Sequence, residues 1–238
     1  MTILCPMKVA YVTGGTKGIG LAVAQSLLSD GYHVAISGRG KESLSEAKAL
    51  LASENLLCLQ SNVKNREEED KSIKQVIDTW GRLDVCIANA GVGHFQPIDE
   101  LSDEQWHDTI DTNLTGVFNT VKACIPEIKS SKGYIITIAS LAGTNFFARG
   151  AAYNASKFGL VGFSQAIMLD LRQYGIKVST IMPGSVSTYF NNHVPSDADA
   201  WKIQPEDIGQ MVIDLLHMNP RTLPSKVEVR PLMPPTKK

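Results

Sequence analysis

Two side chains that could exchange a proton stand four residues apart in the stretch YNASK, which contains Tyr153 and Lys157. On a helix this spacing places both on one face. A phenol has an ordinary pKa of about 10, but a neighbouring ammonium favours its ionised form. The pair therefore indicates a tyrosine adapted to acid–base chemistry, with the hydroxyl of Ser140 following an apolar run nearby in the sequence. An ordinary surface helix that carries a Tyr and a Lys would also explain this pair of residues.

A glycine-rich stretch, YVTGGTKGIG, spans residues 11–20 and follows a short apolar run. Glycine is costly inside regular structure, so this density suggests that a ligand approaches the backbone closely. Where a strand turns into a helix, free N–H groups attract a phosphate. A Walker phosphate loop is excluded because Gly18, rather than Ser or Thr, follows Lys17. The spacing also differs from G-x-G-x-x-G, and a plain structural turn remains an alternative at this point.

The elements that must position these residues alternate along the chain. Apolar, β-rich runs predict strands, and helical spacing of apolar positions predicts helices between them. The predicted strands are Lys8–Val12, His33–Ser37, Leu56–Gln60, Leu83–Asn89, Tyr134–Ala139, Lys177–Met182 and Lys226–Arg230, and the predicted helices are 21–31, 41–54, 66–81, 102–128, 151–175 and 204–218. This alternation predicts an α/β fold with a doubly wound parallel sheet, Rossmann-like, in three α/β/α layers. No linker or repeat divides residues 1–238, so we expect one domain.

Helix ends have their own signals. Gly31, Gly81 and Gly175 are placed to close helices, and Ser102 with Gln105 resembles a capping box. The glycine-rich turn then lies at the carboxyl end of the first strand, where open α/β sheets bind ligands.

Composition excludes several classes of partner. Lys and Arg number 23 and Asp and Glu 24, a net charge of −1, which argues against nucleic acid or an anionic membrane surface. The five histidines are scattered, so we expect no metal site. Neither a leader pattern nor an apolar run of membrane-spanning length is present, and the four cysteines, Cys5, Cys58, Cys86 and Cys124, are typical of free buried thiols. We expect a cytoplasmic protein.

The motifs taken together resemble the short-chain dehydrogenases/reductases, in their compact single-domain form, over nearly the whole chain. TGGTKGIG (Thr13–Gly20) resembles the coenzyme-binding turn of that family, and ANAG (Ala88–Gly91) its N-N-A-G segment, with Ala88 in place of the first Asn. MPGSVST (Met182–Thr188) resembles the loop beside the nicotinamide. Asn113, in DTNLTG, together with Ser140 and YNASK matches the catalytic Asn, Ser, Tyr and Lys in order.

The resemblance implies a catalytic set of Asn113, Ser140, Tyr153 and Lys157, with Ser140 and Tyr153 contacting the substrate. Tyr153 would supply a proton to a carbonyl oxygen that Ser140 hydrogen-bonds, while Lys157 would lower the pKa of Tyr153 and bind the nicotinamide ribose. Asn113 would help to hold a water relay to Lys157. The implied coenzyme contacts are Gly14, Thr16, Lys17, Gly18, Ile19, Gly20, Arg39, Asn62, Val63, Asn89, Ala90, Gly91, Tyr153, Lys157, Pro183, Gly184, Val186 and Thr188.

The second predicted strand indicates which coenzyme binds. An acidic residue at its end would bind the ribose 2′-hydroxyl of NAD, but Gly38 stands there and Arg39 follows. With Lys17, two cations could hold the 2′-phosphate of NADP, so we predict NADP(H) as coenzyme. In that family an Asp contacts the adenine, and Asn62 takes its place here.

Substrate signals are fewer. Tyr189–Trp201 falls where the family carries a variable substrate lid. Five aromatic residues could form an apolar pocket or belong to the core: Phe95, Phe146, Phe147, Tyr189 and Phe190. His94 could line the cleft or be exposed, and Arg149 alone is no evidence for an acidic carrier protein.

The predicted function is hydride transfer between NADP(H) and a small or medium, apolar carbonyl compound or alcohol. Alternatives are a 3-oxoacyl-thioester reductase and, in another class, a non-catalytic NADP(H)-binding regulatory protein. A sugar-nucleotide epimerase or dehydratase would need a larger carboxyl-terminal domain. Apolar residues surround most of the helix expected over 152–172, so we predict a homo-oligomer. The resemblance implies a tetramer, with a dimer as the alternative.

Overall fold

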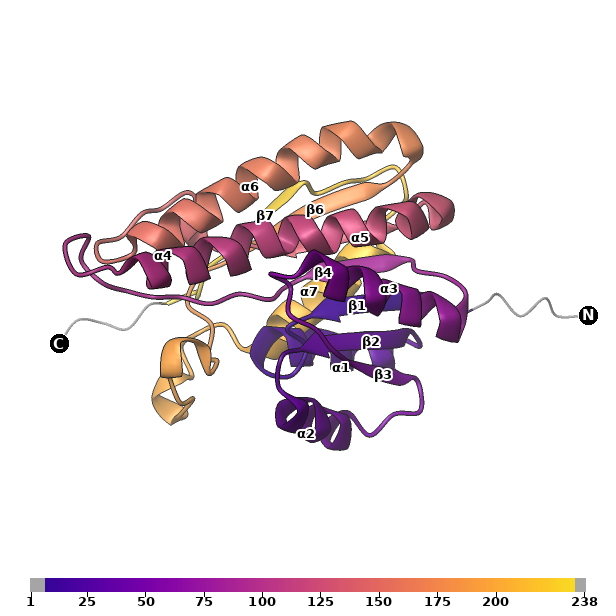
Figure 1. Cartoon of the computed structure of the whole chain (residues 1–238), viewed down its shortest axis with the longest axis horizontal. Coiled ribbons are helices and arrows are strands. Elements are labelled where there is room, and N and C mark those ends of the chain that lie inside the picture. Colours follow the sequence, from indigo (N-terminus) through magenta and orange to yellow (C-terminus); the bar gives the residue numbers. More distant parts are fainter. Residues whose placement is uncertain (1–6, 234–238) are drawn as a thin grey trace, which may run out of the picture.

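The computed structural model describes residues 7–233 and contains one parallel sheet (Figure 1). Its strands are β1 (Val9–Thr13), β2 (His33–Gly38), β3 (Leu56–Gln60), β4 (Val85–Ala88), β5 (Tyr134–Ile138), β6 (Lys177–Pro183) and β7 (Lys226–Val229). The strand order is β3-β2-β1-β4-β5-β6-β7, and every pairing is parallel. The order reverses between β1 and β4, which opens a crevice at the carboxyl ends of these strands. The doubly wound, Rossmann-like fold is confirmed.

Helices cover both faces of the sheet. They are α1 (Gly18–Ser29), α2 (Lys41–Leu51), α3 (Arg66–Trp80), α4 (Asp103–Ile110), α5 (Gly116–Ser131), α6 (Ala151–Leu171) and α7 (Pro205–His217). One buried core joins the sheet to α3, α5 and α6, and a second joins its other face to α1, α2 and α7. Figure 1 shows these layers, with α4, α5 and α6 together on one side. A 3-10 turn, Leu141–Gly143, follows β5, and three others lie at Arg172–Tyr174, Phe190–Asn192 and Asp197–Asp199.

The alternation of side chains along β1 explains the two cores. Val9 and Tyr11 enter the core beneath α3, α5 and α6, whereas Ala10 and Val12 enter the core beneath α1, α2 and α7. Successive residues of a strand point to opposite faces, and helices cover both faces here. The strand is therefore apolar throughout, which is why it appears in the sequence as a continuous apolar run.

Most predicted element ends lie within two residues of the observed ones. Gly31, Gly81 and Gly175 have positive φ at helix ends, and Ser102 with Gln105 forms the capping box. The main difference is the helix expected over 102–128. It is interrupted by a π-helical turn at Asp111–Thr115, which separates α4 from α5. A π-turn inserts a residue into the helical ladder without changing the apolar spacing enough to reveal it.

None of the helices in the described part of the chain is long and apolar enough to cross a membrane. Cys58, Cys86 and Cys124 are free thiols; Cys86 and Cys124 are buried and Cys58 is half-buried. Cys5 lies outside the described residues. Within residues 7–233 no cluster of His, Cys, Asp or Glu could hold a metal ion.

Candidate active site

A cavity of about 930 Å³ opens at the carboxyl ends of the central strands. Of the predicted catalytic and coenzyme-binding residues, all line it except Gly20 and Asn113. Segments far apart in the sequence meet here: the turn after β1, the ends of β2, β4 and β5, the first turns of α6 and the loop after β6. Its volume is near the upper end of that expected for a site binding one small ligand, so it has room for an extended one.

The glycine-rich turn is shaped by close backbone contacts. Gly14 and Gly18 have φ of +63° and +54°, a conformation that glycine adopts without strain. Gly20 lies behind the wall, where a Cβ atom would stand 2.2 Å from the carbonyl oxygen of Gly14. Asn89, at the end of β4, donates its side-chain amide to the carbonyl oxygens of Thr13 and Gly14. The turn is therefore fixed from behind and presents backbone to the cavity.

Ser140 and Tyr153 meet inside the cavity. Ser140 follows β5, and Tyr153 lies in the first turn of α6. The Ser140 hydroxyl hydrogen-bonds the phenol, which lowers the pKa of Tyr153, but burial has the larger effect and raises it to about 12. Lys157 is not among the groups that shift the pKa of Tyr153 in this structure, and its lowering of that pKa stays a prediction.

The position of Lys157 explains this result. Its Nζ donates to the carbonyl oxygen of Ile138 at 3.0 Å and lies 5.8 Å from the centre of the Tyr153 ring. Only 4% of Lys157 is exposed, and burial lowers the pKa of its ammonium to about 8. Lys157 therefore loses its proton slightly above neutral pH, whereas an ordinary lysine has a pKa of 10.5.

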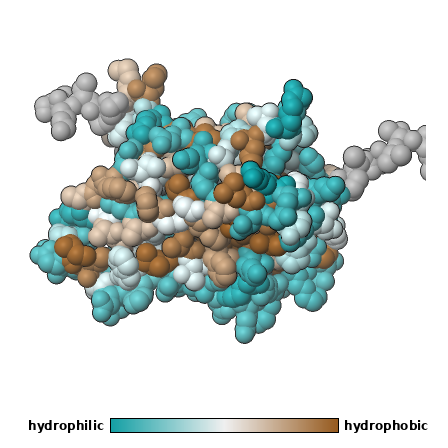
Figure 2. Space-filling model, turned by 90° about the horizontal axis from the view of Figure 1, so that it is seen from above, coloured by the Kyte–Doolittle hydropathy of each residue, from teal (hydrophilic) through white to brown (hydrophobic). Residues whose placement is uncertain are grey.

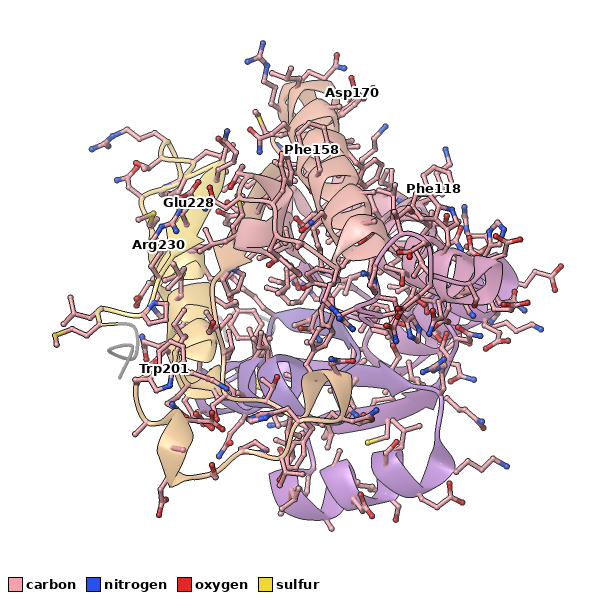
Figure 3. All side chains as sticks on the ribbon, turned by 90° about the vertical axis from the view of Figure 1, so that its left-hand side faces the viewer. Phe118, Phe158, Asp170, Trp201, Glu228 and Arg230 are labelled. Atoms are coloured by element: carbon pink, nitrogen blue, oxygen red, sulfur yellow. The ribbon has the colours of Figure 1, made fainter. Side chains whose placement is uncertain are left out.

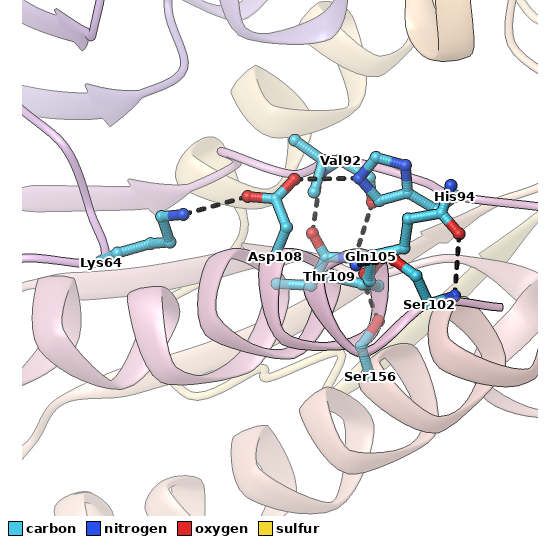
Figure 4. Close-up of polar contacts among 9 residues, drawn as sticks. Lys64, Val92, His94, Ser102, Gln105, Asp108, Thr109 and Ser156 are labelled. Atoms are coloured by element: carbon cyan, nitrogen blue, oxygen red, sulfur yellow. Dashed lines mark hydrogen bonds and ion pairs between the residues drawn. The ribbon is translucent and has the colours of Figure 1, made fainter.

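Asn113 lies in the π-helical turn and is fully buried behind the cavity. Its side-chain oxygen accepts from the N–H of Val92 at 2.8 Å, and its amide donates to the Val92 carbonyl and to the Ser156 hydroxyl. Figure 4 draws these contacts, which join the π-helical turn to the loop after β4 at Val92 and to α6 at Ser156. In this structure Asn113 fixes the loop that forms one wall of the cavity, and the water relay stays a prediction.

Two cations stand at the end of the cavity beside β2. Lys17 and Arg39 are exposed, line the cavity and form no ion pair among the described residues. A Cβ atom at Gly38 would lie 2.8 Å from Thr16 Cγ2, so a carboxylate there would require Thr16 to move. The side-chain oxygen of Asn62 accepts from the backbone N–H of Lys64.

Only some of the residues predicted to contact the substrate line the cavity. Phe95, Phe147, Tyr189 and Phe190 line the cavity, whereas Phe146 does not and packs against Phe158 outside it. His94 is half-buried, lies outside the cavity wall, and contacts Asp108, which also pairs with Lys64 (Figure 4).

Several residues that line the cavity were not predicted from the sequence. Thr112 is 6% exposed, and its hydroxyl has no hydrogen-bond partner in the described structure. Its position beside Asn113 was the only available signal. Other polar lining residues that were not predicted include Ser37, Ser61, Asn145, Ser185, Lys202 and Arg230. Most of them belong to loops or strand ends whose placement depends on tertiary packing.

The model of the short chain dehydrogenase family matches residues 8–199. The chain belongs to this family. An uncharacterized oxidoreductase of Staphylococcus aureus (strain MW2) is 33% identical over 234 residues, which cover 98% of this chain and 100% of that protein.

Solved structures agree with this short-chain dehydrogenase in fold. An alcohol dehydrogenase from the archaeon Thermococcus sibiricus, complexed with 5-hydroxy-NADP, is 28% identical with a TM-score of 0.90 and covers 98% of this chain and 100% of its own. A metagenomic short-chain oxidoreductase in complex with NADP is 33% identical with a TM-score of 0.83, covering 95% and 98%. The protein is therefore an NAD(P)-dependent oxidoreductase of this family.

Proposed function

We propose that this short-chain dehydrogenase transfers hydride between NADP(H) and a small or medium carbonyl compound or its alcohol, with Tyr153 as the proton donor and acceptor. The observation that carries the proposal is the set of side chains that line the cavity. The hydroxyls of Ser140 and Tyr153 and the ammonium of Lys157 share a cavity with two exposed cations, Lys17 and Arg39. No carboxylate lines that cavity within the described residues.

The shape and charge of the cavity fit NADP(H). The turn after β1 leads into α1, and its glycines Gly14 and Gly18 expose backbone to the cavity, which suits the binding of a pyrophosphate. Lys17 and Arg39 supply positive charge where the 2′-phosphate would lie, and Gly38 offers no competing carboxylate. The Thr112 hydroxyl is a further free donor and acceptor on the wall. The Thermococcus sibiricus alcohol dehydrogenase and the metagenomic oxidoreductase described above hold 5-hydroxy-NADP and NADP, which supports the same choice.

The side chains of this protein donate the proton and stabilise the negative charge that develops on the carbonyl oxygen. The coenzyme supplies the hydride when bound. Ser140 holds the carbonyl oxygen and stabilises negative charge on it, and Tyr153 donates the proton to that oxygen. Because burial raises the pKa of Tyr153 to about 12, the phenol is protonated near neutral pH, which suits the direction of carbonyl reduction. Lys157, adjacent on α6, can turn toward a bound ribose and the phenol.

A coenzyme titration and a substrate screen test the proposal. NADPH and NADH are titrated against the parent and Arg39→Ala, with Lys41→Ala as control because Lys41 is an exposed cation of α2 outside the cavity. Charge-assisted hydrogen bonds predict about a ten- to hundredfold loss of NADPH affinity for Arg39→Ala alone. Aldehydes, ketones and 3-oxoacyl thioesters are then offered with NADPH. Equal losses for both coenzymes would overturn the NADP(H) assignment, and coenzyme binding without any turnover would favour a regulatory protein.

We further propose a homo-oligomer, a dimer or a tetramer. Figure 2 shows the face that carries α6, across which apolar side chains extend. Phe118 and Phe158 point outward from α5 and α6 (Figure 3) and are 47% and 61% exposed. Phe146 and Leu169 add 64% and 54% exposed side chains. Exposed apolar side chains gathered on one face are typical of an interface between subunits.

We also propose that the protein is cytoplasmic, which the free thiols Cys58, Cys86 and Cys124 support.

A further inference from the structure

Three phenylalanines from three different segments surround the ring of Tyr153. Phe95 comes from the loop after β4, Phe147 from the loop before α6, and Phe190 from the segment after β6. Their ring centres lie 5.4, 6.4 and 5.6 Å from that of Tyr153, and Phe95 contacts the other two at 5.7 and 6.2 Å. All three line the cavity beside Ser140. The reacting end of the site therefore has an aromatic wall.

The backbone holds this wall in place. Gln96 and Gly150 form a bridge between the first two segments, and the Asn154 amide donates to the carbonyl oxygen of Phe147. Gly93 packs against Phe190 so closely that a Cβ atom there would lie 2.6 Å from its ring. Rings fixed in this way form a preformed surface and lose little side-chain freedom when a ligand binds.

The segment that carries Phe190 is fastened by a buried carboxylate. Asp199 is 5% exposed, and its oxygens contact His193 Nε2 and Lys202 Nζ, both at 2.6 Å. The backbone N–H of Ser196 also donates to it at 3.1 Å. These contacts close residues 193–202 into a compact loop, and the backbone N–H of His193 donates to the carbonyl oxygen of Phe190 at 3.2 Å, which joins Phe190 to this loop.

The charges beside the rings limit the kind of ligand. Aromatic cages often bind quaternary ammonium groups, but those sites gain from nearby negative charge. Here no carboxylate among the described residues lines the cavity, whereas Lys157 does. Lys202 and Arg230 also line it and are paired with Asp199 and Glu228. A cationic ligand would therefore meet the Lys157 ammonium and no stabilising carboxylate. Flat rings pair edge-to-face or offset with other rings and gain more than their buried area alone provides.

We infer that the substrate of this site is an uncharged or anionic carbonyl compound whose carbonyl carbon bears an aryl group, and that Phe147 and Phe190 select the aryl group. This inference rests on the proposed function, because Tyr153 and Ser140 place the carbonyl oxygen beside the rings. The carbonyl oxygen lies between the two hydroxyls, and the aryl group lies against the phenylalanines.

The test compares acetophenone with cyclohexyl methyl ketone, which have the same number of heavy atoms but differ in the flatness of the ring. The ratio of their kcat/KM values is measured for the parent, Phe147→Leu, Phe190→Leu and the control Phe146→Leu. Intrinsic reactivity cancels when ratios are compared between variants. Ring–ring contacts predict that each lining variant lowers the aryl preference, by about tenfold for the two combined. Phe146→Leu should leave the ratio unchanged, because Phe146 lies outside the cavity.

A binding measurement separates this inference from the proposed function. Benzamide and cyclohexanecarboxamide are not reduced, and their binding to the protein saturated with NADPH is followed by calorimetry. The parent should bind benzamide more tightly, and Phe147→Leu and Phe190→Leu should reduce that difference. Equal affinities in the parent, or ratios that both lining variants leave unchanged, would overturn the aryl assignment even if ketones are reduced. Absence of all turnover with the aryl preference in binding intact would instead overturn the proposed reaction.

Discussion

Replacing Lys157 with Met should stabilise the coenzyme-free protein at neutral pH. The ammonium is buried, and its pKa falls from the ordinary 10.5 to about 8. This difference corresponds to roughly 3 kcal/mol of unfavourable burial of the charge, because one pKa unit is about 1.4 kcal/mol. The variant also loses the hydrogen bond to the Ile138 carbonyl, which is worth about 1–2 kcal/mol. A net gain of about 1–2 kcal/mol is expected at pH 7.

The lowered pKa of Lys157 also determines how the stability of the protein changes with pH. Between pH 8 and 10.5 the unfolded chain binds the Lys157 proton and the folded chain does not, so the stability of the parent rises with pH across this window. The penalty is fully present below pH 8 and absent above 10.5. Denaturant unfolding of parent, Lys157→Met and the exposed-lysine control Lys122→Met at several pH values measures it. A gain that does not shrink between pH 8 and 10.5 would refute the reasoning.

Three further outcomes are expected. Ser140→Ala should lower kcat with little change in NADPH affinity, measured by steady-state kinetics and titration, because it removes one donor to the carbonyl oxygen, worth about a hundredfold. Asp199→Asn should raise KM for ketones, since it loosens the contacts of His193 and Lys202, and unchanged kinetics would contradict the lid assignment. Phe158→Glu should shift the protein toward monomer in light scattering at micromolar concentration, whereas a monomeric parent would refute the oligomer.

The sequence predicted the sheet and its helices because their apolar periodicity is a local property. Tyr153 and Lys157 could be placed on one face of a helix for the same reason. The hydrogen bond of Lys157 to Ile138 could not be predicted, since it depends on how α6 packs on β5. The burial that raises the pKa of Tyr153 also depends on this packing, so the net direction of that pKa could not be predicted from the sequence.

Other parts of the site lacked any local signal. The π-helical turn at Asp111–Thr115 changes hydrogen bonding rather than apolar spacing, so the sequence predicted an unbroken helix there. The aromatic wall brings together three loops, and the sequence named its members without separating Phe146, which faces away from the cavity. Loop placement of this kind follows from long-range contacts such as the bridge between Gln96 and Gly150.

The most direct test of the account is single-turnover reduction of a ketone by bound NADPH in the parent and in Tyr153→Phe. The variant keeps the ring that packs against Phe95 and removes only the phenolic hydroxyl. The account predicts unchanged NADPH affinity and loss of hydride transfer, followed at the nicotinamide absorbance, by at least about a hundredfold. Near-normal hydride transfer in Tyr153→Phe, with a ketone that the parent reduces, would contradict the assignment of Tyr153 as the proton donor.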